Sequence, residues 1–179
     1  MSEPATISNG VDQRSEFLFD LSGIDLSARA ADRDQVQAVI PHRFELALLD
    51  GVIWLADDYA MALGVKHVRE DEFWVRGHFP GRPLLPGVLM VEAAAQLACY
   101  QFNVRQPKPQ LAAFLRIEDC AFRRSVEPGQ DLLLLCRELK YSRRRFVTDT
   151  QGLIQTPDGL QVAFEAKLSG MSLGDADLA

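Results

Sequence analysis

The pattern of apolar and polar residues divides the chain into one helical segment and a series of strands. Residues 87–103 are apolar nearly all round, which predicts a helix buried inside the protein. Residues 51–57 and 59–68 are rich in Val, Ile, Trp and Tyr and predict two strands joined by a tight turn. The prolines and glycines of residues 78–86 exclude a regular element, so a loop is expected between the second strand and the helix.

Four more strands are predicted after the helix. They cover residues 111–124, 131–141, 146–155 and 160–168, and the last two connections have the length of hairpins. One buried helix with two strands before it and four after it favours an α+β domain. In this domain an antiparallel sheet of about six strands wraps around one long central helix.

The two ends of the chain differ from this central pattern. Residues 1–35 are expected to form an N-terminal extension, residues 36–171 the main domain and residues 172–179 a flexible tail. Residues 1–14 are small and polar and are expected to fray, whereas residues 17–26 are apolar enough to pack on the domain or on a partner subunit. Asp32 or Asp34 is expected to cap a short helix that ends at Pro41.

Composition and charge exclude several classes of protein. The 179 residues are 47% hydrophobic and 25% charged, which is typical of one globular domain. The net charge of −6 comes from the ends of the chain, since residues 40–171 carry equal numbers of acids and bases. Without a basic footprint, nucleic-acid binding is not expected. The longest apolar stretch, residues 84–102, carries Glu92 and Gln96 through its middle, so no membrane span is expected either.

Cysteine and histidine spacing gives no sign of a metal or disulfide framework. The three cysteines form no CxxC pair and follow no secretory leader, which favours a reducing, cytoplasmic setting. The three histidines lie far apart in the sequence. No metal site is therefore expected.

Glu92 is the first candidate for chemistry, because it falls in the second turn of the predicted buried helix. Burial raises the pKa of a carboxyl and makes it a proton donor at neutral pH. The alternative is a carboxylate that pairs with an arginine and fastens the helix. Gln96 lies one turn further along the same face and is expected to support Glu92 by a hydrogen bond.

His78 is the second candidate. It lies in a segment with three prolines and three glycines in eleven residues, and such a stiff bend suits an acid–base group; the alternative is a structural or solvated histidine. Gly87 opens the predicted helix, so its free N–H at the positive end of the helix dipole suits a developing oxyanion.

These residues belong to a run, GHFPGRPLLPGVLMVEAAAQ, that resembles the signature of the β-hydroxyacyl-[acyl carrier protein] dehydratases of fatty-acid synthesis. These are hotdog-fold enzymes of the FabZ/FabA type. The segments IPHRFELALLDGV and FLRIEDCAFRRSVEPGQDL resemble the same family, and the likeness spans residues 36–168. A Glu where the FabA branch has Asp favours the FabZ branch.

The resemblance implies a role for each matching residue. His78 and Glu92 match the catalytic pair, which face each other across a dimer interface. Gly87 matches the glycine whose amide binds the thioester carbonyl, and Gln96 matches the glutamine that orients the carboxylate. Their neighbours Phe79, Pro86 and Val88 are expected to contact substrate.

The implied reaction converts a (3R)-3-hydroxyacyl thioester on acyl carrier protein to the trans-2-enoyl thioester, with no cofactor. The minimal active unit would be a homodimer, with a trimer of dimers as the larger alternative. Two other functions remain open: a hotdog acyl thioesterase, and a non-catalytic subunit that binds acyl carriers.

Two further expectations concern the acyl tunnel and the carrier. Phe114 and Arg116 are candidate tunnel residues. Arg116 replaces a residue that is small in many relatives. If its side chain pointed inward it would shorten the tunnel, and if it pointed outward it would lie on the protein surface. An acidic carrier would dock on basic side chains. The candidates are Arg82, Arg123, Arg124, Arg143, Arg144 and Arg145. For residues 143–145 the alternative is a solvated hairpin with no docking role.

Overall fold

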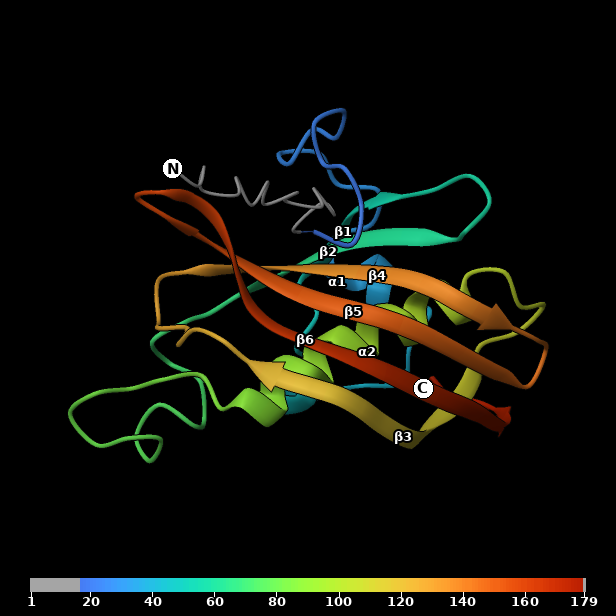
Figure 1. The fold of residues 1–179 in the computed structure, drawn as a ribbon. Helices are drawn as coiled ribbons and strands as arrows, with labels where there is room; N and C mark the ends of the chain where they lie inside the picture. Colours follow the sequence, from blue (N-terminus) through green and yellow to red (C-terminus); the bar gives the residue numbers. More distant parts are fainter. Residues whose placement is uncertain (1–16, 179) are drawn as a thin grey trace, which may run out of the picture.

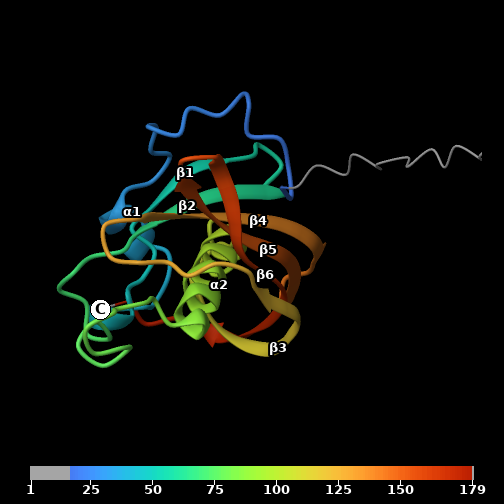
Figure 2. The same ribbon diagram turned by 60° about the vertical axis from the view of Figure 1, so that its left-hand side comes forward.

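A six-stranded antiparallel sheet curls around one long helix in the computed structural model, which describes residues 17–178 (Figures 1 and 2). The strand order is β1-β2-β4-β5-β6-β3. This arrangement confirms the predicted α+β architecture. The strands are β1 (Gly51–Leu55), β2 (Met61–His67), β3 (Gln110–Phe122), β4 (Asp131–Tyr141), β5 (Arg145–Thr156) and β6 (Gly159–Asp175). The expected fraying of residues 1–14 lies outside the described residues.

The central helix, α2 (Gly87–Asn103), has the predicted bounds. Its apolar side chains pack against the inner face of the sheet and form the main core with α1 and the loops. At its end Asn103 bonds to Val39 O and to both backbone groups of Gln110, which fixes the helix to the start of β3. The helix is not buried all round, however, because Val88 is 72% exposed and the Glu92 side chain 26% exposed.

The strand β3 forms one edge of the sheet and pairs only with β6 among the described strands. Its large apolar side chains are unusually open to solvent: Leu111, Phe114, Leu115, Ile117 and Phe122 are 44–52% exposed. An unpaired edge of this kind is a template for association with another chain.

The N-terminal segment packs on the outer face of the sheet. Phe19 is buried there in a second cluster with Ile53, Leu63 and Leu135, and Leu18 N donates to Gln151 Oε1 at 2.9 Å. The segment leads into α1 (Arg33–Gln37), where Asp32 is the N-cap and Gln35 completes a capping box. The capping choice that the sequence left open therefore falls on Asp32.

The expected tail boundary at residue 171 is wrong. Strand β6 continues to Asp175, and Ser172 is buried opposite Ala112. The extra residues pair with the first part of β3, whose backbone groups would otherwise lack partners. Of the helices in residues 17–178, none has the length and apolar character that crossing a bilayer demands.

Candidate active site

The loop before α2 fixes one orientation and one tautomer of His78. Its Nδ1 lies 2.8 Å from Leu84 O, and the chain folds back so that Leu84 N donates to His78 O at 2.8 Å. The Phe79 ring stacks on the imidazole with 4.2 Å between centroids. A carbonyl oxygen can only accept, so Nδ1 carries the proton and Nε2 presents a free lone pair. The arrangement suits a general base.

Gly87 lies in the same cavity as His78, together with Val88, Pro86 and Phe122. Gly87 is the first residue of α2, and its N–H has no hydrogen-bond acceptor within residues 17–178. The Phe122 ring packs so close that a Cβ at position 87 would lie 2.7 Å from it. With the ring in this position glycine leaves the N–H open to a carbonyl oxygen, and a larger residue would have to displace the Phe122 side chain.

Glu92 is held by Gln96, one turn further along α2. Gln96 is fully buried and its Nε2 donates to Glu92 Oε1 at 2.9 Å and to Leu46 O at 2.7 Å. Its Oε1 accepts from the backbone N–H groups of Leu48 and Leu49. The expected contact between Gln96 and the carboxyl is therefore present, and it also anchors the segment before β1.

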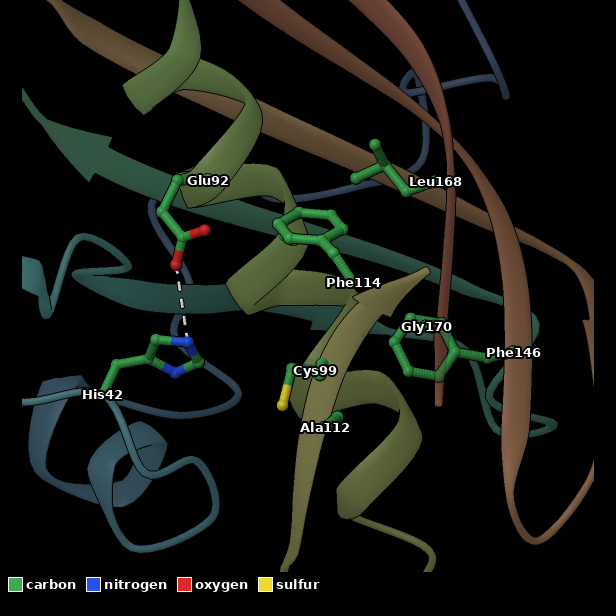
Figure 3. Close-up of a pocket in the computed structure, with 10 residues that line it drawn as sticks. His42, Glu92, Cys99, Ala112, Phe114, Phe146, Leu168 and Gly170 are labelled. Atoms are coloured by element: carbon green, nitrogen blue, oxygen red, sulfur yellow. Dashed lines mark ion pairs between the residues drawn. The ribbon is translucent and has the colours of Figure 1, made fainter. Parts of the chain in front are cut away.

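A cavity of about 50 Å³ is lined by Glu92 and by side chains of α2 and the sheet (Figure 3). Apart from Glu92 and His42 the wall is apolar, and the remaining lining residues are Ala95, Cys99, Ala112, Ala113, Phe114, Phe146, Leu168 and Gly170. Such a wall suits an acyl chain. Burial raises the pKa of the Cys99 thiol to about 12, so this group stays uncharged in the cavity.

The two tunnel candidates separate at a β-bulge. Phe114 lines the cavity and pairs with Gly170 of β6. Arg116 pairs with Ser169, which is adjacent to Gly170, so Leu115 is the extra residue of the bulge. The bulge reverses the alternation, and Arg116 lies on the outer side, 69% exposed and paired with Glu118 at 3.1 Å. Arg116 is therefore not part of the cavity wall in this chain.

His42 is a site residue that sequence reasoning missed. Its Nε2 lies 3.4 Å from Glu92 Oε1, and its Nδ1 is buried without a partner in the described part of the chain. Burial lowers the pKa of His42, an effect that outweighs the opposing charge of Glu92. The only sequence signal was the position of His42 in the segment IPHR. The arginine that sequence reasoning offered as an alternative partner of Glu92 is not found among residues 17–178, where His42 and Gln96 take that place.

A single chain therefore presents two separate half-sites. His78 and Gly87 line one cavity, and Glu92 and His42 line another, with no residue common to both walls. The structure of one chain does not bring the predicted catalytic pair into one pocket.

The basic residues fall into two groups. Arg123 and Arg124 line the cavity of His78, where they contact Glu165 and Gln161 respectively, and Arg82 is exposed in the adjoining loop. The other three, residues 143–145, lie at the β4–β5 connection, at the end of the sheet remote from that loop (Figures 1 and 2). Within one chain, only the first group lies beside a half-site.

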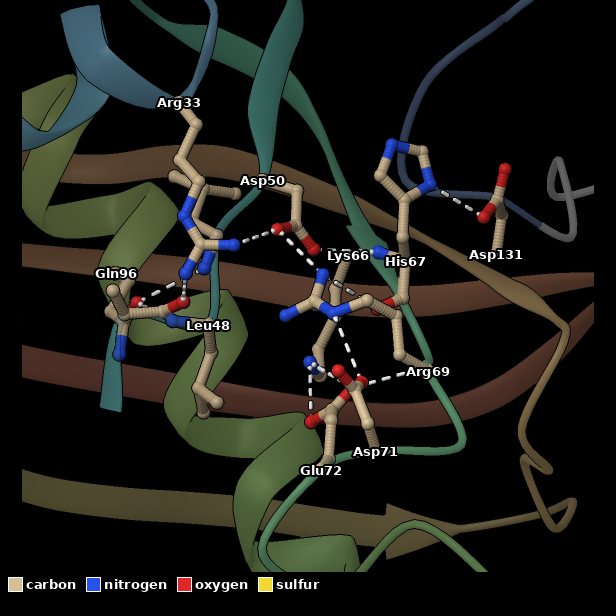
Figure 4. A network of polar contacts seen from close by, with 12 residues as sticks. Arg33, Leu48, Asp50, Lys66, His67, Arg69, Asp71, Glu72, Gln96 and Asp131 are labelled. Carbon is tan, nitrogen blue, oxygen red and sulfur yellow. Dashed lines mark hydrogen bonds and ion pairs between the residues drawn. The ribbon is translucent and has the colours of Figure 1, made fainter. Parts of the chain in front are cut away.

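A polar network supports both half-sites from behind (Figure 4). Asp50 accepts from Arg33, from Arg69 and from the backbone N–H of His67. Next to it, Glu72 binds the fully buried Lys66. The network joins the segment that follows His42 to the segment that leads to His78.

Residues 40–164, more than two thirds of the chain, match the family model described as the FabA-like domain. The chain belongs to the FabA-like family. The predicted resemblance is thereby confirmed.

This FabA-like chain is 37% identical over 139 residues to the 3-hydroxyacyl-[acyl-carrier-protein] dehydratase FabZ of Bacillus pumilus, covering 77% of this chain and 93% of the relative. The FabZ of Brucella abortus is 36% identical over 152 residues, covering 83% and 94%. These values confirm a FabZ-like protein.

Solved structures agree on the fold. The dehydratase heterocomplex ApeI:P from Xenorhabdus doucetiae superposes with a TM-score of 0.65 at 17% identity, covering 76% of this FabA-like chain and 90% of the other. Cj0977, a sigma28-regulated virulence protein from Campylobacter jejuni, gives a TM-score of 0.61 at 16% identity, covering 87% and 100%. At these identities the likeness concerns the hotdog fold alone.

Within residues 17–178, no three His, Cys, Asp or Glu side chains are grouped as metal ligands require.

Proposed function

We propose that this protein removes water from a 3-hydroxyacyl thioester carried by an acyl carrier protein and releases the 2-enoyl thioester. The single observation that carries the proposal is the pair of complementary half-sites. One presents an imidazole with a free Nε2, and the other a carboxyl at the entrance of an apolar cavity. The curated FabZ relatives, which are named for this reaction, support it.

The proposed mechanism uses each group for one task. His78 Nε2 removes a proton from the carbon next to the thioester carbonyl, and the Gly87 N–H stabilises the negative charge that develops on the carbonyl oxygen. Glu92 donates a proton to the β-hydroxyl, which leaves as water while the double bond forms. One proton moves to His78 and one leaves Glu92, and a proton that passes from His78 back to Glu92 through water restores both groups for the next turnover.

A homodimer is the proposed active unit, since one chain keeps His78 and Glu92 in different cavities. The exposed apolar side chains of β3 give the surface on which two copies would associate. Association through β3 would allow His78 of one copy to reach the Glu92 cavity of the other. A trimer of such dimers is the larger alternative.

Arg82, Arg123 and Arg124 are the proposed dock for an acidic carrier, because Arg123 and Arg124 line the cavity of His78 and Gly87 and Arg82 is exposed in the adjoining loop. A cytoplasmic setting also belongs to the proposal and is supported by the three free cysteines. If the dock is electrostatic, added salt lowers turnover of carrier-bound substrate more than turnover of a short thioester analogue. Equal sensitivity to salt would remove the dock from the proposal.

The deciding experiment combines product analysis with mixed dimers. Purified protein is expected to convert a 3-hydroxyacyl carrier thioester to the enoyl thioester, whereas free acid and thiol would identify a thioesterase. His78→Ala and Glu92→Gln should each remove most activity. Coexpression of the two variants should restore part of it, since a mixed dimer contains one site with both groups intact. Active single variants would overturn the site assignment, and no recovery on mixing would overturn the composite site.

A further inference from the structure

We propose that His42 is a positioning residue for the Glu92 carboxyl: its neutral ring donates Nε2–H to Oε1 and leaves Oε2 as the oxygen that transfers the proton. This inference rests on the proposed dehydratase function and adds a residue that acts through Glu92. His42 lies fifty residues before Glu92 in the sequence, yet its Nε2 is 3.4 Å from the carboxyl in the folded chain (Figure 3). This separation is long for a hydrogen bond, and we expect it to shorten when substrate closes the site.

The two oxygens of Glu92 have different surroundings. Oε1 accepts from Gln96 Nε2 and faces His42, whereas Oε2 has no hydrogen-bond partner within residues 17–178. Figure 3 shows one carboxyl oxygen toward His42 and the other turned away from it, on the side of Phe114. With the His42 donor added to the hydrogen bond from Gln96, Oε1 accepts from two donors in the proposed arrangement, and such an oxygen disfavours a proton of its own. The proton of the acid form therefore belongs on Oε2, beside the cavity.

The orientation of Gln96 is determined by its other contacts. Its oxygen accepts from two backbone N–H groups, at 2.9 Å from Leu48 and 3.1 Å from Leu49, so its nitrogen must face Leu46 O and Glu92. A flipped amide would bring two oxygens together at Leu46. Gln96 thus acts as a donor to Glu92 in either protonation state of the carboxyl.

The surroundings of His42 favour its neutral form with the proton on Nε2. Its Nδ1 is buried and has no partner in the described chain, so a proton there would be a buried donor without an acceptor. The imidazolium form requires such a proton, which agrees with the lowered pKa of His42. The titratable groups near the pair are Arg43 and the uncharged Cys99 thiol, and none of the other cavity-lining residues titrates.

The backbone around His42 gives the ring a fixed position. Pro41 precedes it, and the Arg43 guanidinium donates to Ile40 O at 2.8 Å, to His42 O at 2.9 Å and to Leu178 O at 2.9 Å. These hydrogen bonds hold the backbone at His42 and at Ile40 to the Arg43 side chain and connect it to the C-terminal segment. A ring held in this way fixes the rotamer of Glu92, which reaches the cavity with Oε2.

A matched pair of substitutions isolates the donor at Nε2. Gln can place its amide nitrogen where Nε2 lies, whereas the shorter Asn reaches only the position of Nδ1. His42→Gln is expected to keep kcat within about 3-fold of the native value, and His42→Asn to lower kcat by about 10–100-fold with KM little changed. Thermal unfolding of both variants should match that of the native protein. Equal activity of the two variants, high or low, would overturn the role of His42.

The protonation state is tested without any turnover. The chain contains only three histidines, so spectra with 15N-labelled histidine can be assigned from the signal that His42→Asn removes. The native protein should show a neutral ring protonated at Nε2 between about pH 6.5 and 8. A proton on Nδ1 in that range would overturn the inference. Inactive native protein with the expected spectrum would refute the proposed function instead, since the ring would be as described while the reaction was wrong.

Discussion

Two glutamates of this chain have opposite surroundings, although both lie near the polar network behind the site. The Glu72 side chain is 7% exposed, and both of its oxygens receive donors: Lys66 Nζ contacts each at 2.9 Å, Arg69 N binds Oε1 and Trp74 Nε1 binds Oε2 (Figure 4). The Glu92 side chain is 26% exposed, and only its Oε1 accepts a hydrogen bond within residues 17–178, from Gln96, with His42 Nε2 at 3.4 Å from the same oxygen (Figure 3).

The difference shows how a fold separates a structural carboxylate from one that can react. Burial alone would raise the pKa of Glu72, but its hydrogen bonds from Arg69, Lys66 and Trp74 outweigh burial and lower it. Glu72 therefore stays ionised and has no free oxygen for a substrate. Glu92 keeps one oxygen open beside an apolar cavity, which is what proton transfer requires.

The largest expected effect comes from Glu92→Gln. The amide retains an oxygen that can accept from Gln96 but has no acidic proton, so kcat should fall by about 10³-fold while the unfolding midpoint stays unchanged. Turnover and thermal unfolding are measured on the same preparation. A loss of stability equal to that of Glu72→Gln would show that both carboxyls are structural and would end the contrast.

The matching substitution, Glu72→Gln, should affect stability instead. It leaves the ammonium of Lys66, which is fully buried, without its counter-ion, and the free energy of unfolding should fall by about 3 kcal/mol. Urea titration measures the change. Glu70→Gln is the control, because Glu70 is exposed and two residues away. If both variants unfold at the same urea concentration, the buried pair contributes nothing to stability.

A smaller effect is expected in the other half-site. In Gly87→Ala the new Cβ would lie 2.7 Å from the Phe122 ring, which is 52% exposed and can turn aside. Stability should therefore change by less than about 1 kcal/mol, while kcat/KM should fall by roughly 10-fold because the displaced ring and the methyl group obstruct the Gly87 N–H. Gly77→Ala, where no atom lies within 4 Å, is the matched control. Comparable kinetics in the two variants would argue against a role for the Gly87 amide.

The sequence predicted what depends on local pattern. Helix α2 follows from its apolar run, and the contact of Gln96 with Glu92 follows from their spacing of one helical turn. The sequence did not predict the contact of His42 with Glu92, since it joins two distant segments that only the folded network aligns. It left the direction of Arg116 open, because the bulge at Leu115 reverses the side-chain alternation without a signal in the residues themselves.

The smallest effects are those of pH on stability, and they occur in two ranges. The pKa of His42 is lowered in the folded protein from 6.5, so below about pH 6.5 the unfolded chain binds more protons at this position and stability decreases. The pKa of Glu72 is lowered from 4.5, so its contribution is complete above that pH and is lost below it.

Each group changes the free energy of unfolding by at most about 1.4 kcal/mol per pH unit. Urea titrations from pH 8 to 3.5 measure both ranges. His42→Gln should remove the slope just below pH 6.5 and leave the acid range intact. Glu72→Gln should reduce only the dependence of stability on pH below pH 4.5. Part of that dependence should remain, because hydrogen bonds from serines lower the pKa values of Asp20 and Asp25. If His42→Gln left the slope below pH 6.5 unchanged, another group would be the source of that slope, and the contrast between the two carboxyls would then have to be drawn without a neutral histidine beside Glu92.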